Sequence, residues 1–182
     1  MNAGVESPLE TKLLAPQSVV TVLDGGVIEG YASIYGRTDQ GGDSVAQGAF
    51  KASLARRGAA GVRMLWQHDP REPIGVWETV EEDRRGLKVR GRLIEATARG
   101  REAAALVAAG AIDGLSIGYR TLRAEKAAGG RRLVELDLWE VSLVTFPMLP
   151  EARLGAKGLM ALPGAAGRIS GLIAEIRAEL AE

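Results

Sequence analysis

Apolar and polar residues follow a period of two along much of the chain, and segments rich in glycine or proline separate these stretches. The alternation is clearest at 87–94, where leucine, valine and glycine alternate with lysine and arginine. This spacing is typical of a strand that buries one face. Similar short runs rich in valine, isoleucine and leucine predict further strands at 19–23, 27–35, 62–67, 74–80, 114–122 and 133–146.

Turn-forming residues separate these runs. Asp24-Gly25-Gly26 stands between the first two predicted strands, and Asp-Gly is a strong signal for a tight hairpin turn. Gly129-Gly130 marks a second turn, between the last two strands. The segment 39–43 is rich in aspartate and glycine and predicts a turn as well. A calcium site is not expected there, because the segment lacks the ligand spacing of an EF-hand loop. Prolines 70 and 73 after Asp69 predict a turn that follows the strand at 62–67.

Three segments have helical spacing. Residues 48–57 are followed by Gly58, which can end a helix. Thr97 can cap a helix that runs to residue 109. Residues 168–182 carry a single apolar stripe at helical spacing, which predicts an amphipathic helix at the end of the chain.

Together these elements predict a mainly β (α+β) fold. We expect a closed antiparallel β-barrel of about six to seven strands with two or three peripheral helices. The segment 154–161 is rich in small residues and is a candidate for self-cleavage. The predicted organisation is a flexible amino-terminal arm at 1–17, the barrel domain at 18–153, a linker at 154–167 and the carboxy-terminal helix at 168–182.

The composition limits the function classes. Lysine plus arginine and aspartate plus glutamate are equally numerous, at 23 each, so charge gives no argument for a nucleic-acid partner. The absence of cysteine excludes a disulfide framework and thiol catalysis. With a single histidine as well, a zinc site of the usual nitrogen and sulfur ligands is not expected. We therefore expect neither a metal nor a cofactor.

The ends and the apolar runs indicate the compartment. Residues 1–6 lack the basic, apolar and cleavage regions of a signal peptide. The longest apolar stretch, 103–112, is much shorter than the roughly 20 residues that cross a bilayer. We therefore expect a soluble, cytoplasmic protein that does not insert into membranes.

Two residues offer the parts of a nucleophile and its base. His68 is the only histidine in the chain, and an unperturbed imidazole titrates at about 6.5, close to neutral pH. Ser116 lies on a predicted strand between Gly114 and Gly118, which permit close approach of a backbone or a substrate. Each residue also has a purely structural interpretation, because buried hydroxyls and imidazoles usually satisfy the backbone.

Glu140 is the first candidate for the acid. In the strand 133–146, a period of two places Glu140 on the same face as Leu136 and Leu138, which predicts that its carboxylate is buried. A buried carboxylate needs a partner, and either an imidazolium or an arginine would serve. Asp69 is a second candidate for the acid, ranked below Glu140 because it follows His68 directly.

Five segments in this order carry a resemblance to a known family, and the match runs from about residue 28 to residue 153. The segments resemble those of the prohead (capsid maturation) proteases of tailed phages. They are Gly30-Tyr31-Ala32-Ser33-Ile34-Tyr35, Asp39…Gly42-Asp43…Gly48-Ala49-Phe50, Leu65-Trp66-Gln67-His68-Asp69-Pro70…Pro73-Ile74-Gly75, Gly114-Leu115-Ser116-Ile117-Gly118-Tyr119 and Glu140-Val141-Ser142-Leu143-Val144-Thr145-Phe146-Pro147…Pro150-Glu151-Ala152.

The resemblance implies a serine endopeptidase with a barrel like that of the herpesvirus assemblins. Such enzymes act inside the immature shell in the host cytoplasm and are absent from, or degraded in, the mature particle. They cut the scaffold or the amino-terminal, scaffold-like segment of the major capsid protein, and often themselves. The expected partners are this capsid protein and further copies of the chain, as a homodimer or higher oligomer. The compact chain would also suit a prophage or a gene transfer agent.

By motif, the resemblance assigns Ser116 as nucleophile and His68 as base. Glu140 occupies the place of the third member, where assemblins have a second histidine. One alternative of another class is a non-catalytic assembly module that binds capsid protein or scaffold. A serine esterase is a weaker alternative, because Ser116 is not in a Gly-x-Ser-x-Gly elbow.

Overall fold

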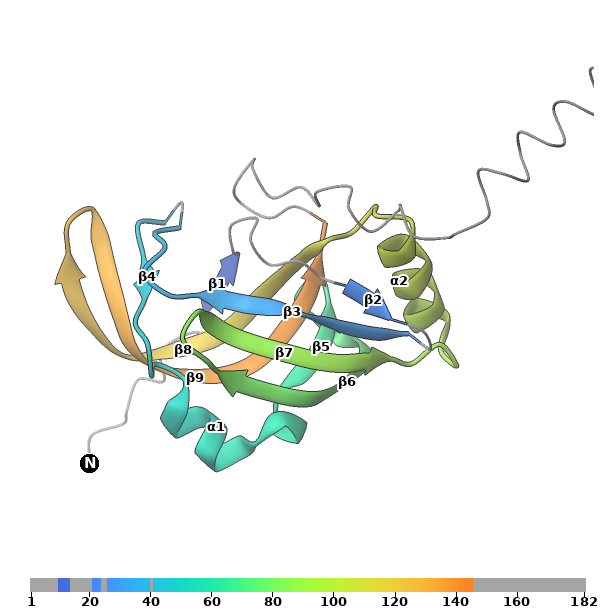
Figure 1. The fold of residues 1–182 in the computed structure, drawn as a ribbon, viewed down its shortest axis with the longest axis horizontal. Coiled ribbons are helices and arrows are strands. Elements are labelled where there is room, and N and C mark those ends of the chain that lie inside the picture. The colour runs from blue at the N-terminus through green and yellow to red at the C-terminus, as the bar shows by residue number, and fades with distance from the viewer. Residues whose placement is uncertain (1–9, 14–20, 24–25, 40, 146–182) are drawn as a thin grey trace, which may run out of the picture.

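The computed structural model describes residues 10–13, 21–23, 26–39 and 41–145, and it is mainly β with two α-helices (Figure 1). The helices are α1 (Lys51–Arg57) and α2 (Ala98–Ala108), and a 3-10 turn η1 (Ala59–Gly61) follows α1. The strands are β1 (Glu10–Leu13), β2 (Thr21–Leu23), β3 (Val27–Ile34), β4 (Ser44–Val45), β5 (Arg63–Trp66), β6 (Asp69–Glu82), β7 (Gly86–Leu93), β8 (Gly114–Ala127) and β9 (Gly130–Val144).

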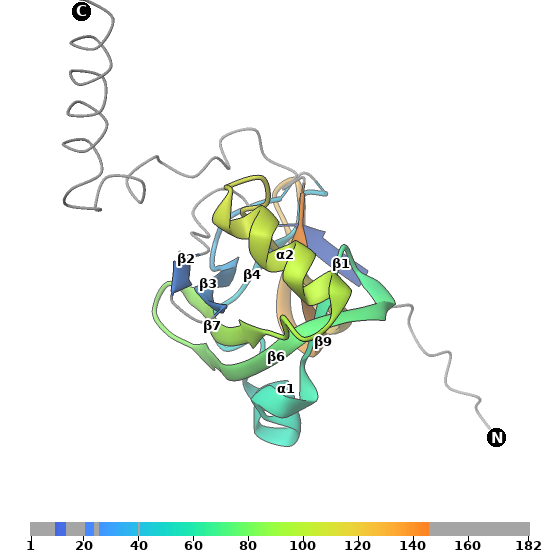
Figure 2. The same cartoon turned by 90° about the vertical axis from the view of Figure 1, so that its right-hand side faces the viewer.

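All nine strands belong to one curled sheet. Its order is β1-β8-β9-β5-β6-β7-β3-β2, and β4 adds to β9 outside this path. Most neighbours are antiparallel, but β5 and β4 both run parallel to β9. Figures 1 and 2 show the sheet bent into an open half-barrel. Each predicted strand is present, and the two strands that the sequence pattern missed are the short β1 and β4.

The predicted closure of the barrel is wrong. Closure would require the outer edges of β3 and β8 to pair with each other. Instead, β2 pairs with β3 along residues 27–29, and β1 pairs with β8 along residues 116–119. Short edge strands therefore cover part of the two edges that would meet in a closed barrel, and the sheet stays open.

The helices lie on opposite sides of the curled sheet. In both views α2 lies above the β6–β7 part of the sheet and α1 lies below it (Figures 1 and 2). As predicted, Gly58 follows the end of α1, with a positive φ of 62°, and Thr97 caps α2 by accepting a hydrogen bond from the Gly100 amide. The third predicted helix, at 168–182, and the predicted linker lie outside the described residues.

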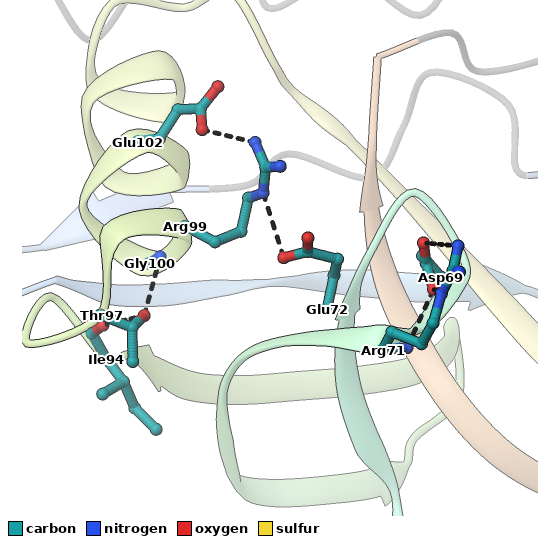
Figure 3. A network of polar contacts seen from close by, with 8 residues as sticks. All are labelled: Asp69, Arg71, Glu72, Ile94, Thr97, Arg99, Gly100 and Glu102. Carbon is teal, nitrogen blue, oxygen red and sulfur yellow. Dashed lines mark hydrogen bonds and ion pairs between the residues drawn. The ribbon is translucent and has the colours of Figure 1, made fainter.

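An ion pair fastens α2 to β6. Arg99 lies in the first turn of the helix, where its Nε is 3.2 Å from Glu72 on β6 and its Nη1 is close to Glu102 of the next turn (Figure 3). The apolar side of α2 adds Ala103 and Val107 to the hydrophobic core. The largest fully buried side chains of that core are Phe50, Ile28, Met64, Ile74, Leu87, Leu115, Ile117, Tyr119, Leu133, Leu136 and Leu138.

A buried carboxylate fastens α1 to β9. Asp137 is 8% exposed and lies 2.5 Å from Arg56 Nη2 and 3.0 Å from Arg57 Nη2, and it accepts a hydrogen bond from Ser53. Burial alone would raise the pKa of the Asp137 carboxyl, but the two arginines outweigh it and hold the pKa below its usual range. The folded state therefore prefers the ionised carboxylate.

This contact predicts how stability depends on pH. Because the folded-state pKa of Asp137 lies below the unfolded value of about 3.9, its stabilisation is present above that pH and is lost as pH falls through the folded value. We expect Asp137→Asn to lower the free energy of unfolding by about 1–3 kcal/mol at neutral pH and to flatten the acid limb. Denaturant melts from about pH 2 to 7 measure both effects.

The matched control is Asp69→Asn. Asp69 also pairs with an arginine, Arg71, but at an exposed site, where ion pairs contribute little to stability. Equal acid dependence in the two variants would contradict the role given to Asp137.

Candidate active site

His68 lies in a two-residue turn between β5 and β6. Trp66 pairs with Asp69, so Gln67 and His68 form the whole connection, with positive φ angles of 52° and 63°. Two successive positive φ angles are typical of the hairpin turns whose twist matches the strands, although non-glycine residues rarely adopt them. The predicted turn at residues 69–73 is wrong in position, because Asp69 already begins β6.

The same turn is fixed to the end of β9. The Gln67 amide donates to the Leu143 carbonyl at 2.9 Å, and the Gln67 side chain exchanges hydrogen bonds with Thr145. These contacts place the His68 imidazole against β8 and β9, where the other two candidate residues lie.

A β-bulge at Trp139 decides where Glu140 points. Gly118 of β8 pairs with Glu140, but the next residue of β8, Tyr119, pairs with Leu138, so Trp139 is the extra residue. The hydrophobic core accordingly includes Leu138 before the bulge and Val141 after it, which are three positions apart. Glu140 is buried, as predicted, with 4% exposure, but it does not share the core face of Leu138.

The three predicted residues form one chain of hydrogen bonds. His68 Nδ1 lies 2.5 Å from Glu140 Oε1, and His68 Nε2 lies 2.7 Å from Ser116 Oγ. Ser116 is completely buried, whereas the His68 side chain is 20% exposed. A carboxylate at Nδ1 favours the tautomer with the proton on that nitrogen. Nε2 is then free to accept the proton of the Ser116 hydroxyl.

Ser142 completes the hydrogen bonding of the carboxylate. Its hydroxyl donates to Glu140 Oε2 at 2.6 Å and accepts a hydrogen bond from the His68 main-chain amide at 3.2 Å. Both oxygens of Glu140 are therefore bonded to residues of the site, and its partner is the imidazole and not the arginine that the sequence also allowed. Asp69, the other candidate acid, is bonded to Arg71 instead (Figure 3).

Sequence reasoning missed Ser142 and the exact role of Gly118. A period of two places Ser142 on the face of Glu140, and this signal could have identified it. Gly118 lies under the Glu140 carboxylate: a Cβ at this position would be 2.2 Å from Oε1 and 2.7 Å from Cδ. Any side chain at Gly118 would therefore displace the carboxylate.

Gly118→Ala should disturb the site more than the fold. The added methyl would push the Glu140 carboxylate away from His68, and misplacement by about 1 Å can lower a reaction rate about 10²-fold. We expect a loss of this size in turnover, measured as cleavage rate at saturating substrate, together with a small fall in melting temperature. A variant with full activity would show that the carboxylate tolerates displacement.

The described residues contain no group of three or more histidine, cysteine, aspartate or glutamate side chains that could hold a metal ion. Among the same residues, no helix is long and apolar enough to span a membrane.

Comparisons with known proteins agree on one family. The sequence profile of the caudovirus prohead serine proteases matches residues 17–160. The prohead protease of Enterobacteria phage HK97 is 34% identical over 135 residues, covering 72% of this chain and 60% of the relative. The capsid polyprotein of Pseudomonas phage PAJU2 is 31% identical over 101 residues, covering 51% of this chain and 15% of the relative. The chain thus matches less than two thirds of the length of either relative.

A solved structure has the same fold. The bacteriophage T4 capsid assembly protease, gp21, superposes with a TM-score of 0.63 at 18% sequence identity, covering 78% of this chain and 99% of that one. The fold, the profile match and the similarity to the HK97 protease lead to one conclusion: the chain belongs to the caudovirus prohead serine protease family.

Proposed function

We propose that this chain is a serine endopeptidase that cleaves the amino-terminal, scaffold-like segment of a capsid protein, and itself, during prohead maturation. The observation that carries the proposal is the hydrogen-bonded series Ser116, His68 and Glu140 in a chain of this family. The names of the relatives, a capsid polyprotein and a capsid assembly protease, support capsid protein as the substrate. The reaction takes place inside the prohead, in the host cytoplasm.

The geometry supports a two-stage acyl transfer. As Ser116 Oγ attacks the peptide carbonyl carbon, His68 Nε2 takes the hydroxyl proton, and the Glu140 carboxylate stabilises the imidazolium that forms. The tetrahedral intermediate collapses, the C–N bond breaks, and His68 returns the proton to the leaving amine. A water molecule then attacks the ester on Ser116 while His68 Nε2 takes its proton. The C–O bond to Ser116 breaks, His68 returns the proton to Ser116 Oγ, and the carboxylic acid and the free enzyme are released.

Co-expression with the cognate capsid protein tests the proposal. Intact-mass analysis should show loss of a defined amino-terminal piece of the capsid protein with the wild-type chain and no loss with Ser116→Ala. If the capsid protein is intact in both samples while particles still form, the proposal fails and the non-catalytic assembly module is favoured.

A further inference from the structure

We propose that Ser142 is a positioning residue that holds the base and the acid of this site in register. The inference rests on the proposed function, because it assigns His68 and Glu140 those roles. Ser142 is completely buried on β9, where it pairs with Ser116 of β8 on one side and with Leu65 of β5 on the other. It therefore lies between the strand of the nucleophile and the strand that leads into the histidine turn.

One hydroxyl group connects two parts of the site. Ser142 Oγ accepts a hydrogen bond from the His68 amide and donates one to Glu140 Oε2. The accepted bond fixes the main chain of a residue with a φ of 63°, a conformation that non-glycine residues rarely adopt. The donated bond orients the carboxylate whose other oxygen contacts the imidazole.

Loss of the hydroxyl removes both restraints together. The His68 amide would lose its acceptor and Glu140 would lose one of its donors, so the imidazole and the carboxylate could each leave the geometry that joins them to Ser116. Small displacements of reacting groups can lower a rate about 10²-fold. We expect the change to act on turnover and not on substrate binding, because both hydrogen bonds of the Ser142 hydroxyl go to His68 and Glu140.

The test compares Ser142→Ala with the wild-type chain in kinetics and in NMR. We expect kcat to fall about 10- to 100-fold while KM changes by less than about twofold. His68 is the only histidine, so its ring nitrogens give a single, unambiguous set of ¹⁵N signals. In Ser142→Ala these signals should shift away from the Nδ1-protonated pattern, and the Nδ1 proton should exchange faster with water. Ser142→Thr, which keeps the hydroxyl, should restore both.

Ser33→Ala is the matched control. It removes a serine hydroxyl that is also completely buried on a strand, β3, but has no hydrogen-bond partner among the described residues, so kcat and the imidazole signals should stay close to wild type. Unchanged ¹⁵N signals and unchanged kcat in Ser142→Ala would overturn the inference. If the wild-type chain cleaves nothing, the proposed function fails, but the NMR comparison still decides whether Ser142 positions His68.

A different observation concerns the outer edge of β8. β1 pairs antiparallel with this edge in the register Leu13 to Ser116, Lys12 to Ile117, Thr11 to Gly118 and Glu10 to Tyr119. The other edge of β8 is held by β9. The strand that carries Ser116 thus has one edge where an extended peptide could add by main-chain hydrogen bonds, and a segment of the chain itself occupies that edge.

We infer that residues 10–13 are a built-in competitor for extended peptides at the β8 edge. An incoming peptide that adds a strand beside Ser116 has to displace β1, because both would bond to the same main-chain groups. Displacement is feasible because β1 is an edge strand of four residues that pairs with β8 alone within the sheet. This inference also rests on the proposed function, in which Ser116 attacks a bound peptide.

The full-length double variant Thr11→Pro with Lys12→Pro tests the inference. Proline has no amide proton for the ladder, and adjacent residues of a strand face alternately, so one of the two changes must remove a bond to β8. We expect Ser116 to react about tenfold faster with a fluorophosphonate probe, because the open form is more populated. The amides of residues 116–119 should also exchange hydrogen faster with solvent.

The same double change at Val5 and Glu6, outside β1, is the control and should leave both readouts unchanged. Unchanged probe reactivity together with unchanged hydrogen exchange in the β1 variant would overturn the inference. If the probe labels no variant, the proposed function fails. Hydrogen exchange at residues 116–119 then still tests whether β1 occupies the edge.

Discussion

Ser116→Ala is expected to lower the rate of peptide-bond cleavage about 10⁴- to 10⁶-fold. Among the described residues, Ser116 Oγ is the hydroxyl within hydrogen-bond distance of His68 Nε2. The variant therefore loses the atom that would form the acyl-enzyme. The residual rate would come only from substrate binding and from polarisation of the carbonyl. Single-turnover cleavage of the capsid protein, followed by intact mass, measures the loss.

Ser33→Ala is the matched control for this experiment. Ser33 is also a completely buried serine on a strand, but its hydroxyl has no hydrogen-bond partner among the residues that the structure describes. Its loss should leave both cleavage and fluorophosphonate labelling unchanged, whereas Ser116→Ala should abolish labelling. Cleavage that persists in Ser116→Ala would move the nucleophile to another residue and would overturn the mechanism.

Much of the fold follows from local sequence signals. The strand at 87–94 was predictable because its period of two reflects one buried face, and the start of α2 because Thr97 is a good cap. That the sheet stays open was not predictable in this way. One of its edges carries β1, whose four residues Glu-Thr-Lys-Leu have no strand pattern and pair with a segment more than a hundred positions away.

For the site as well, the residue types were predictable from the sequence and their geometry was not. The type of each group was readable from the sequence: a lone histidine, a serine between glycines and a carboxylate in an apolar strand. The geometry that joins them depends on two irregularities, the positive φ angles at Gln67 and His68 and the bulge at Trp139. Neither position has the glycine that would mark such a feature, so a regular period of two predicted the burial of Glu140 correctly and its face incorrectly.

Glu140→Gln is expected to lower kcat about 10²- to 10⁴-fold, a smaller loss than that of Ser116→Ala. The amide keeps the size of the side chain but removes the charge that stabilises the imidazolium. An amide NH₂ directed at His68 Nδ1 would also require the proton to be on Nε2, and this tautomer cannot accept the proton of Ser116. The ¹⁵N signals of the single imidazole report the tautomer directly. The fall in kcat and the change of tautomer can therefore be measured in the same variant.

Asp69→Asn separates the two candidate acids. Asp69 follows His68 in the chain, but its carboxylate is bonded to Arg71, and that arginine holds the pKa of Asp69 below its usual range through hydrogen bonds at the surface. Its replacement should therefore leave kcat and the imidazole tautomer unchanged. Loss of activity in Asp69→Asn with normal activity in Glu140→Gln would reverse the assignment. Loss in Glu140→Gln alone, with a shifted tautomer, would establish that the bulge at Trp139 delivers the acid of the site.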